Sequence, residues 1–207
     1  MATEGMDLKG EERFGRITSR LYNVLALLWG GLLYDFAAKD MLAGRSGRKE
    51  ISILDVGTGP GILPEKLACM RKDAHICGVD PSETMVEIAR KRLRNSGVRV
   101  ELGYSLMVPF RQKFDIICST MSFHHWAHKK ESLIYLSRFL KKDGEIRVYE
   151  MRKGKDLPLI GFLQGHRMNR GELESASNGT GLKVNWIRET KIFICASYSR
   201  HKSARSA

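Results

Sequence analysis

The stretch from Ile51 to Ala68 reads Ile-Ser-Ile-Leu-Asp-Val-Gly-Thr-Gly-Pro-Gly-Ile-Leu-Pro-Glu-Lys-Leu-Ala. A short apolar run ends in three closely spaced glycines and then passes into an amphipathic segment. This order predicts a buried strand, a tight loop and a helix. A loop with so few side chains lets a ligand approach the backbone at the head of a helix, so the stretch predicts a binding site.

The rest of the chain repeats this alternation. Further strands are predicted over residues 74–80, 98–102, 114–119 and 145–150, with helices over 63–71, 81–94 and 130–140. Residues 103–113 read as a loop with room for a short helix, and residues 168–178 as a helix. Strands that alternate with helices indicate βαβ units and a mostly parallel sheet. The predicted fold class is therefore α/β, a Rossmann-like three-layer sandwich.

The last two predicted strands, residues 182–188 and 191–197, are joined by the short turn Glu189-Thr190. A parallel crossover needs a dozen or more residues, so these strands form a hairpin that puts one antiparallel strand into the sheet. At 207 residues the chain has the length of one α/β domain with a substantial core.

The composition is 43% hydrophobic and 28% charged, with a net charge of +12. This balance is typical of a soluble globular protein, and the positive charge attracts phosphates, anionic lipid or acidic substrates. The basic residues are scattered along the chain, as on ordinary solvated surfaces, whereas a nucleic-acid footprint would need them on one face. RNA binding is therefore the alternative interpretation of the positive net charge.

The four cysteines are far apart and form no CxxC pair, which predicts neither a zinc site nor a disulfide framework. Together with an N-terminus unlike a signal peptide, this favours the reducing cytoplasm. The longest apolar stretch, Leu21 to Tyr34, is interrupted by Asn23 and Gly30-Gly31 and is too short to span a bilayer.

Residues 11–42 are predicted to form two helices hinged at Gly30-Gly31. Three roles are open for them. They pack on the core, they form a lid over a ligand pocket with Tyr22 and Tyr34 as polar contacts, or they make a weak contact with a membrane surface.

The glycine loop and its acidic neighbours restrict the ligand. Asp80 lies twenty-three residues after Gly57 at a predicted strand end, which suits a carboxylate that binds ribose hydroxyls, although a strand-end capping aspartate is the alternative. The dinucleotide pattern GxGxxG is not met, because Ile62 stands where its last glycine belongs, and no Gly-Lys-Ser/Thr of a P-loop follows. Asp55 suits a cationic amino group rather than phosphates. S-adenosylmethionine carries both a ribose and positive charge.

At these residues the chain resembles the class I S-adenosylmethionine-dependent methyltransferases, and within them the ubiquinone/menaquinone-biosynthesis-like group (methyltransferase type 11). The motifs that carry the resemblance are Ile53-Leu54-Asp55-Val56-Gly57-Thr58-Gly59-Pro60-Gly61, Gly78-Val79-Asp80-Pro81-Ser82, Phe114-Asp115-Ile116-Ile117-Cys118-Ser119 and Leu136-Ser137-Arg138-Phe139-Leu140-Lys141-Lys142-Asp143-Gly144-Glu145. The resemblance covers about residues 50–150. It implies a seven-stranded sheet with the last hairpin inserted antiparallel, and S-adenosylhomocysteine as the product of the cofactor.

By position, the resemblance implies that Asp55 holds the amino group of the cofactor and that Asp80 binds both ribose hydroxyls. The glycines line the methionine moiety, Pro81 or Met85 packs on the adenine, and Ser119 offers its backbone carbonyl. The cofactor residues expected in full are Asp55, Gly57, Thr58, Gly59, Gly61, Asp80, Pro81, Met85, Tyr104, Ser105 and Ser119.

The chain departs from the family pattern at Gly103-Tyr104-Ser105, where relatives commonly read Gly-Asp-Ala. Tyr104 has no carboxylate to accept from the adenine amino group, so the adenine contacts are expected from the backbone, Ser105 or Tyr104 itself.

Candidate catalytic residues follow the fourth predicted strand, where a methyl acceptor would lie. His124 or His125 could accept a proton from the acceptor, since a histidine side chain titrates near neutral pH, and the alternative is that both pack beside Trp126. His128 completes a His-His-x-x-His pattern, but without nearby carboxylates or cysteines no metal is expected. Weaker catalytic candidates are Glu150 and Tyr22, while His166 and Arg167 are expected to shape the acceptor pocket.

The sequence thus predicts one domain over residues 1–207. It divides into an N-terminal helical lid or cap (1–49), a cofactor-binding core (50–150), and an acceptor-side insertion with the hairpin and a basic tail (151–207). The expected function is methyl transfer to a small, partly apolar acceptor. An RNA methyltransferase and a non-catalytic S-adenosylmethionine-binding regulatory protein are the alternatives, and the acceptor and the oligomeric state are left open.

Overall fold

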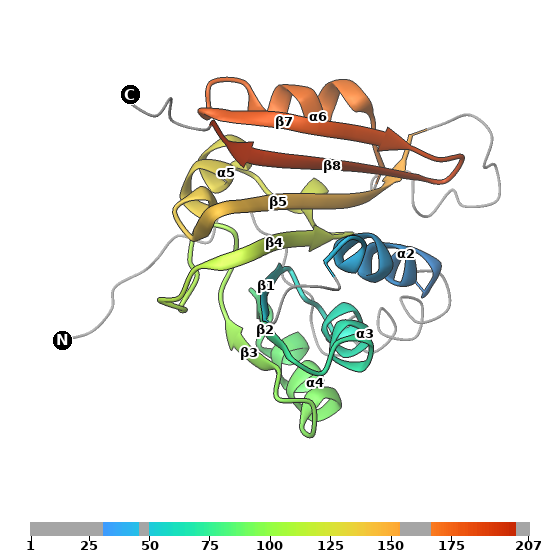
Figure 1. Cartoon of the computed structure of the whole chain (residues 1–207), viewed down its shortest axis with the longest axis vertical. Coiled ribbons are helices and arrows are strands. Elements are labelled where there is room, and N and C mark those ends of the chain that lie inside the picture. The colour runs from blue at the N-terminus through green and yellow to red at the C-terminus, as the bar shows by residue number, and fades with distance from the viewer. Residues whose placement is uncertain (1–30, 46–49, 154–166, 202–207) are drawn as a thin grey trace.

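The computed structural model describes residues 31–45, 50–153 and 167–201 (Figure 1). The strands in this part of the chain are β1 (Ile51–Val56), β2 (Ala74–Asp80), β3 (Arg99–Leu102), β4 (Phe114–Thr120), β5 (Leu140–Arg152), β6 (Arg167–Met168), β7 (Leu182–Glu189) and β8 (Phe193–Arg200). The helices are α2 (Gly31–Leu42), α3 (Ile62–Met70), α4 (Glu83–Leu93), the short 3-10 helix η1 (Phe123–His125), α5 (Lys129–Ser137) and α6 (Arg170–Ser177). The expectations for Tyr22, His166 and the basic tail lie largely outside the described residues.

Seven strands form one sheet in the order β3-β2-β1-β4-β5-β8-β7, and the two-residue β6 pairs with β5 beside it. Neighbours from β3 to β5 run parallel, whereas β8 is antiparallel to both β5 and β7. The predicted α/β class and the antiparallel C-terminal hairpin are confirmed. The strand order reverses between β1 and β4, and open α/β sheets bind ligands at such a point, beyond the carboxyl ends of the strands.

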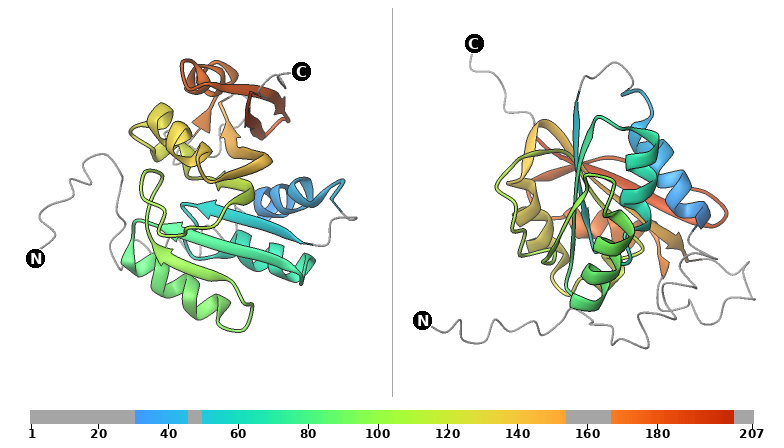
Figure 2. Two further views of the ribbon diagram at one scale, coloured as in Figure 1. Left: turned by 60° about the vertical axis from the view of Figure 1, so that its left-hand side comes forward. Right: turned by 90° about the horizontal axis from the view of Figure 1, so that it is seen from below.

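Helices cover both faces of the sheet. The right-hand view of Figure 2 shows α2 and α3 on one side of the strands and α5 on the other. Every residue of β1 and β4 is buried, which is why their sequences are nearly continuous apolar runs. Alternate β1 residues serve the two layers: Ile53 belongs to the core beneath α2 and α3, and Leu54 to the core beneath α5 and α6.

The helix α2 packs on the sheet through Ala37, Ala38 and Met41, which are fully buried. Tyr34, considered above as a contact of a lid, is also buried in this core. At least for residues 31–42, the segment is a core helix.

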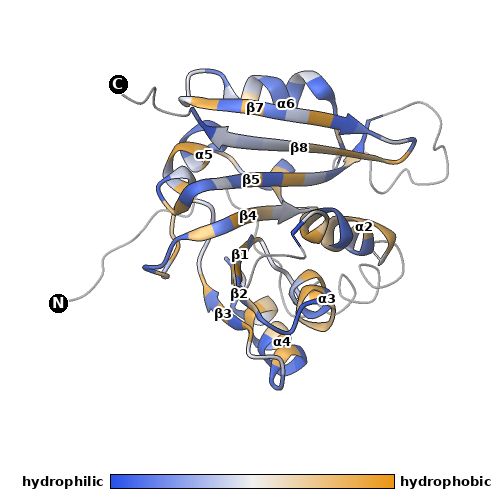
Figure 3. Cartoon of the chain, in the orientation of Figure 1, coloured by the Kyte–Doolittle hydropathy of each residue, from blue (hydrophilic) through white to orange (hydrophobic). Residues whose placement is uncertain are grey.

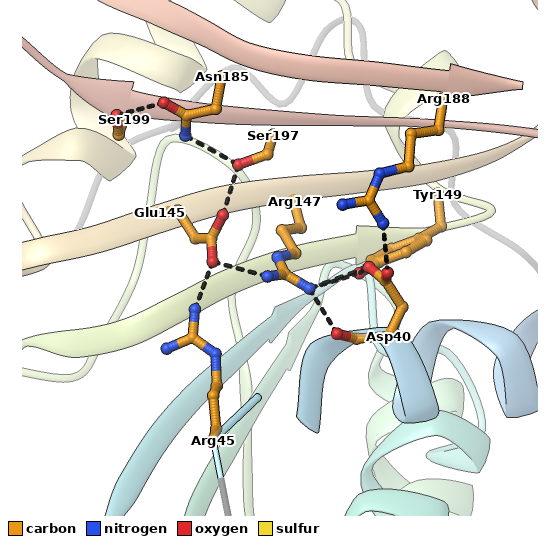
Figure 4. A network of polar contacts seen from close by, with 9 residues as sticks. All are labelled: Asp40, Arg45, Glu145, Arg147, Tyr149, Asn185, Arg188, Ser197 and Ser199. Atoms are coloured by element: carbon orange, nitrogen blue, oxygen red, sulfur yellow. Dashed lines mark hydrogen bonds and ion pairs between the residues drawn. The ribbon is translucent and has the colours of Figure 1, made fainter. Parts of the chain in front are cut away.

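A polar network fixes the end of α2 to β5 (Figure 4). Arg147 donates through Nη1 to the backbone oxygen of Asp40 at 2.8 Å and to Asp40 Oδ2 at 2.9 Å, and through Nη2 to Glu145 at 2.8 Å. The Tyr149 hydroxyl donates to Asp40 Oδ2 at 2.8 Å. Hydrophilic and hydrophobic residues alternate along β5 in Figure 3, and the three β5 members of the network share one face of the strand. A cation at the carboxyl end of a helix also complements its dipole.

The largest errors in the predicted boundaries lie between α5 and β5. The helix predicted over residues 130–140 ends at Ser137, and the strand predicted over 145–150 starts at Leu140 and runs to Arg152. The Lys-Lys-Asp-Gly sequence resembles a helix stop, but it lies in the strand where the register with β4 shifts. A side chain at Gly144 would place its Cβ 2.8 Å from the Phe114 carbonyl oxygen, so glycine permits this approach. Residues 103–113 form no helix, only an isolated bridge between Tyr104 and Met107.

Candidate active site

The glycine loop turns tightly over the end of β2. The backbone N–H groups of Gly57 and Thr58 both donate to the Val79 carbonyl, at 2.8 and 2.9 Å. Gly57 has φ 76° and Gly59 has φ 53°, a left-handed conformation that favours glycine. A Cβ on Gly57 would lie 1.8 Å from Ser122 Oγ, whereas a Cβ on Gly59 would meet no heavy atom within 4 Å. The loop is therefore packed against the protein at Gly57 and open at Gly59.

Gly61 lies on the other side of the loop, at the N-cap of α3. A Cβ here would lie 2.9 Å from Leu93 Cδ1 and 3.2 Å from Ala89 Cβ, both on α4. The lack of a side chain at Gly61 thus permits the close packing of α3 against α4.

Asp80 joins the loop to the end of β2. Its Oδ2 accepts from the Gly59 N–H at 2.8 Å, and its Oδ1 accepts from the Ser82 N–H at 3.0 Å. Burial raises the pKa of Asp80 to about 6, against the lowering effect of these two hydrogen bonds. Each carboxylate oxygen retains a further lone pair for another donor.

Asp55 is buried under the same loop. Its Oδ2 accepts from the Thr58 hydroxyl at 2.7 Å, and the Cys118 thiol points to its Oδ1 at 3.6 Å. Burial raises the pKa of Asp55 to about 7, and the nearby Asp80 carboxylate adds to the increase. A cation near Asp55 would favour its charged form.

The other expected cofactor residues lie around these strand ends. Pro81 follows Asp80, and Met85 is buried in the first turn of α4, which Ser82 caps. Tyr104 follows β3 and exchanges backbone hydrogen bonds with Met107 at 3.0 and 2.9 Å. The Ser105 hydroxyl accepts from Ser132 on α5 at 2.8 Å. Ser119 is fully buried near the end of β4, and its hydroxyl has no hydrogen-bond partner among the described residues.

The chain leaves β4 through a strained residue. Met121 has φ 57°, which is uncommon for a side chain other than glycine, and its N–H donates to the Tyr149 carbonyl at 2.9 Å. Ser122 follows, with its hydroxyl accepting from the Trp126 indole at 3.3 Å. This turn places Ser122 against Gly57 and starts η1.

The helix η1 carries the histidine pair. His124 Nδ1 lies 2.8 Å from Glu150 Oε2, and the His124 backbone N–H donates to Glu150 Oε1 at 3.2 Å. Both side chains are buried, with 7% of His124 and 0% of Glu150 exposed. The His125 ring lies 4.0 Å from the His124 ring, centroid to centroid. Glu150, a weaker candidate from sequence, is thus the partner of His124.

A hollow of about 560 Å³ opens beside His124, between η1 and α5 on one side and β6 and α6 on the other. His128 lines it at the N-cap of α5. Within residues 31–45, 50–153 and 167–201, no group of three or more His, Cys, Asp or Glu side chains could hold a metal ion. No helix in the described part of the chain is long and apolar enough to cross a membrane.

Residues 54–148 match the family model described as "Methyltransferase domain". They include the glycine loop, Asp80 and both histidines. Residues 54–148 form a class I S-adenosylmethionine-dependent methyltransferase domain. The resemblance predicted from the motifs is confirmed, and the cofactor of this domain is S-adenosylmethionine.

The methyltransferase domain is similar to known proteins in sequence. It is 32% identical over 98 residues to the uncharacterized methyltransferase YdaC of Bacillus subtilis, covering 47% of this chain and 54% of that protein. It is 30% identical over 118 residues to the ubiquinone/menaquinone biosynthesis C-methyltransferase UbiE of Wigglesworthia glossinidia brevipalpis, covering 54% and 46%. The chain therefore spans about half the length of these relatives.

Solved structures show the same fold. A proposed S-adenosylmethionine-dependent methyltransferase of Methanococcus maripaludis superposes with a TM-score of 0.77 at 19% identity, over 97% of this chain and 100% of that chain. A methyltransferase of Aquifex aeolicus does so with a TM-score of 0.72 at 20% identity, over 89% and 98%.

The residues present in the methyltransferase domain fit S-adenosylmethionine. The backbone at Gly59 is open, Asp80 retains acceptor capacity for a ribose diol, and Asp55 is a buried carboxylate whose charged form a cation would stabilise. The cofactor supplies an ammonium and a sulfonium. The polar groups of these residues therefore agree with the cofactor of the family.

The raised pKa of Asp55 predicts pH-dependent binding. Affinity for S-adenosylhomocysteine, which keeps the ammonium, should rise about tenfold from pH 6 to pH 8, because Asp55 must lose its proton to pair with a cation. Calorimetric titration at pH 6, 7 and 8 measures this slope, and Asp55→Asn should bind weakly with little slope. The stability of the ligand-free protein should fall as pH rises from about 4 to 7, since only the folded state holds this proton. An affinity of the unchanged protein that is flat across this range would contradict the assignment.

Sequence reasoning missed three features of the domain. The contact of Ser122 with Gly57, the hydrogen bond between Ser132 and Ser105, and the hollow beside His124 all join residues that are distant in sequence. No local motif signals any of them. Glycine at position 57 indicated a close approach, but not which residue makes it.

Proposed function

We propose that this chain transfers the methyl group of S-adenosylmethionine to a small acceptor, with His124 as the general base. The observation that carries the proposal is the hydrogen bond of His124 to the buried Glu150. His124 lies two residues after Ser122, and Ser122 lies against Gly57 of the glycine loop. The base thus lies on a short segment of backbone, residues 122–124, that packs against the loop of the methyl donor.

The cofactor roles follow from the positions of the residues. Asp80 would accept from the ribose hydroxyls, Asp55 would pair with the ammonium, and the open backbone at Gly59 would approach the methionine moiety. Pro81 and Met85 on one side, and Tyr104 and Ser105 on the other, flank the place for adenine. Gly57, Thr58 and Gly61 would shape the loop, and the Ser119 carbonyl would face the amino-acid end.

Bound S-adenosylmethionine supplies an electrophilic methyl group on a sulfonium. The protein aligns the acceptor and excludes water. With Nδ1–H donating to Glu150, the lone pair of His124 is on Nε2, which can take the proton of an acceptor hydroxyl, amine or acidic carbon. The Glu150 carboxylate then stabilises the imidazolium that forms. His125, whose ring contacts that of His124 at an angle of 45°, would support its orientation.

The distribution of the basic residues favours a small acceptor over RNA. Basic residues on different elements are engaged in ion pairs, such as Arg92 with Glu65, Arg147 with Asp40 and Arg170 with Glu189. They are distributed over the molecule rather than collected in one stripe. A purely regulatory role would leave the buried pair of His124 and Glu150 without a purpose.

The cysteines support a cytoplasmic location as part of the proposal. Cys77, Cys118 and Cys195 are buried and Cys69 is exposed, all as free thiols. A reducing compartment keeps such thiols intact.

Replacement of Asp80 tests the cofactor site. In Asp80→Asn an amide N–H₂ would face the Gly59 or Ser82 N–H, so we expect affinity for S-adenosylhomocysteine to fall about 100-fold. Isothermal calorimetry measures this affinity. Asp143 is exposed near the start of β5, at the end of the strand away from the candidate site. The control variant Asp143→Asn should therefore bind S-adenosylhomocysteine like the unchanged protein. Equal affinities of Asp80→Asn and Asp143→Asn would refute the ribose role.

A further inference from the structure

A set of exposed cations lies at the end of the sheet that is remote from the glycine loop. The strands β4, β5 and β7 start at this end and the antiparallel β8 finishes there, on the left-hand side of Figure 1. The helix α5 also ends there, because only Arg138 and Phe139 connect it to β5. These segments carry seven cations, here called the basic end: Arg111, Lys113, Arg138, Lys141, Lys142, Lys183 and Arg200.

Contacts between the segments show that these cations are neighbours in space. Lys113 Nζ donates to the carbonyl oxygen of Arg138. The Arg200 guanidinium donates to the carbonyl oxygens of Leu140 at 3.0 Å and Lys141 at 2.8 Å. On the far side, Lys183 lies opposite the residue before Arg200 in the ladder of β7 and β8. Segments that are distant in sequence therefore meet at one end of the molecule.

Most of the positive charge of the basic end is not neutralised by the fold. The carboxylates on the same segments are Asp115 and Asp143, and Asp115 pairs with Lys141 at 2.7 Å. The bonds of Lys113 and Arg200 to carbonyl oxygens leave their charges uncompensated. The remaining four cations form no ion pair with any residue that the structure describes: Arg111, Arg138, Lys142 and Lys183.

The shape of the basic end favours a flat anionic partner. The cations extend over the starts of three strands and across to the end of α5 in the covering layer, so they form an area rather than a stripe. No Phe, Tyr or Trp side chain in the described part of the chain is exposed, which leaves no ring to stack on a nucleotide base. Clustered Lys and Arg residues are attracted to anionic phospholipid through each charge, without insertion of apolar groups.

We propose that the basic end holds this chain reversibly against an anionic phospholipid surface. The cytoplasmic leaflet of a membrane has such a surface, with a negative potential that attracts polybasic segments. The strand β5 has 13 residues, so about 40 Å of strand separates the basic end from the candidate active site. The site would face the aqueous phase and stay accessible to a dissolved cofactor and acceptor. This proposal does not rest on the proposed function.

Vesicle binding tests the proposal. The full chain is sedimented with vesicles of equal parts phosphatidylglycerol and phosphatidylcholine, and with vesicles of phosphatidylcholine alone. At about 50 mM salt we expect binding to the anionic vesicles only, and at about 500 mM salt we expect release, because salt screens exposed charges.

Two double variants remove the same charge from opposite ends of the molecule. Lys142→Gln with Lys183→Gln should weaken binding to the anionic vesicles about 20-fold, or roughly fivefold for each charge. Lys130→Gln with Lys191→Gln takes two cations from the first turn of α5 and from the turn between β7 and β8. This control should weaken binding no more than about twofold, since its charges lie beyond the Debye length from the vesicle. All four lysines are exposed and form no ion pair with a described residue, so both variants should keep their fold.

Equal losses in the two double variants would overturn the proposal, because they would show that net charge alone drives binding. Absent binding to the anionic vesicles at low salt, or equal binding to the neutral vesicles, would also overturn it. A single-stranded RNA of mixed sequence is the competing partner. If it binds more tightly than the vesicles and is weakened by Lys142→Gln with Lys183→Gln alone, the basic end is an RNA surface and the proposal is wrong. None of these readouts involves methyl transfer, so failure of the proposed function is a separate outcome.

Discussion

Replacing His124 by alanine is expected to lower the rate of methyl transfer about 100- to 10,000-fold, the usual worth of a positioned general base. The affinity for S-adenosylhomocysteine should stay unchanged, because His124 lies beyond the glycine loop rather than in it. Transfer of a radiolabelled methyl group into an active metabolite fraction measures the rate, and calorimetry measures the affinity.

Variants of the neighbours separate catalysis from structure. Glu150→Gln keeps the shape of the side chain, but its amide can donate to His124 Nδ1 and move the proton to Nε2, so the rate should fall by a comparable factor. His75→Ala, at an exposed histidine near the start of β2, should keep the rate. If neither His124→Ala nor His125→Ala altered the rate, histidine base catalysis would be refuted.

Replacing Gly57 by alanine is expected to lower the free energy of unfolding by about 2–5 kcal/mol, through a left-handed backbone and overpacking. The new Cβ would lie 1.8 Å from Ser122 Oγ and 2.5 Å from Ser122 Cβ. Rotation of the hydroxyl relieves only the first contact, because Ser122 Cβ is fixed by the backbone. Urea denaturation of the ligand-free protein measures the loss.

Two further variants separate strain from collision. The double variant Gly57→Ala with Ser122→Gly removes the colliding atoms and should recover all but the strain, about 1–2 kcal/mol. Gly59 has φ 53°, but a Cβ there would have open space around it. Gly59→Ala should therefore lose stability through backbone strain alone, and it should also lose affinity for the cofactor. If Gly57→Ala were as stable as Gly59→Ala, the packing of the loop against Ser122 would be wrong.

The elements set by local sequence were the predictable ones. Continuous apolar runs predicted β1, β2 and β4, with the bounds of β2 and β4 correct to within one residue. The short turn at Glu189-Thr190 predicted the hairpin of β7 and β8. The family motifs gave the sheet and the cofactor. The error at the start of β5 arose because Lys141 to Gly144 has the chemistry of a helix stop, while pairing with β4 determines its conformation.

The candidate active site was predictable where a recognisable motif marks the residues at the ends of parallel strands. Asp55, the glycines and Asp80 could be placed at one edge of the sheet because parallel strands end together. The partner of His124 could not be chosen, because no motif marks Glu150 and the pairing depends on β4 and β5 lying side by side. The walls of the hollow come from η1, α5, β6 and α6, so only the folded chain forms it.

The most direct test of the central claim is the fate of a radiolabelled methyl group. The purified chain, S-adenosylmethionine labelled in its methyl group and a cell extract divided into RNA, lipid and small-metabolite fractions are incubated together. We expect label in the small-metabolite fraction, lost with Asp80→Asn and at least 100-fold slower with His124→Ala. Label in RNA, or label in no fraction from a protein that binds S-adenosylhomocysteine, would contradict methyl transfer to a small acceptor.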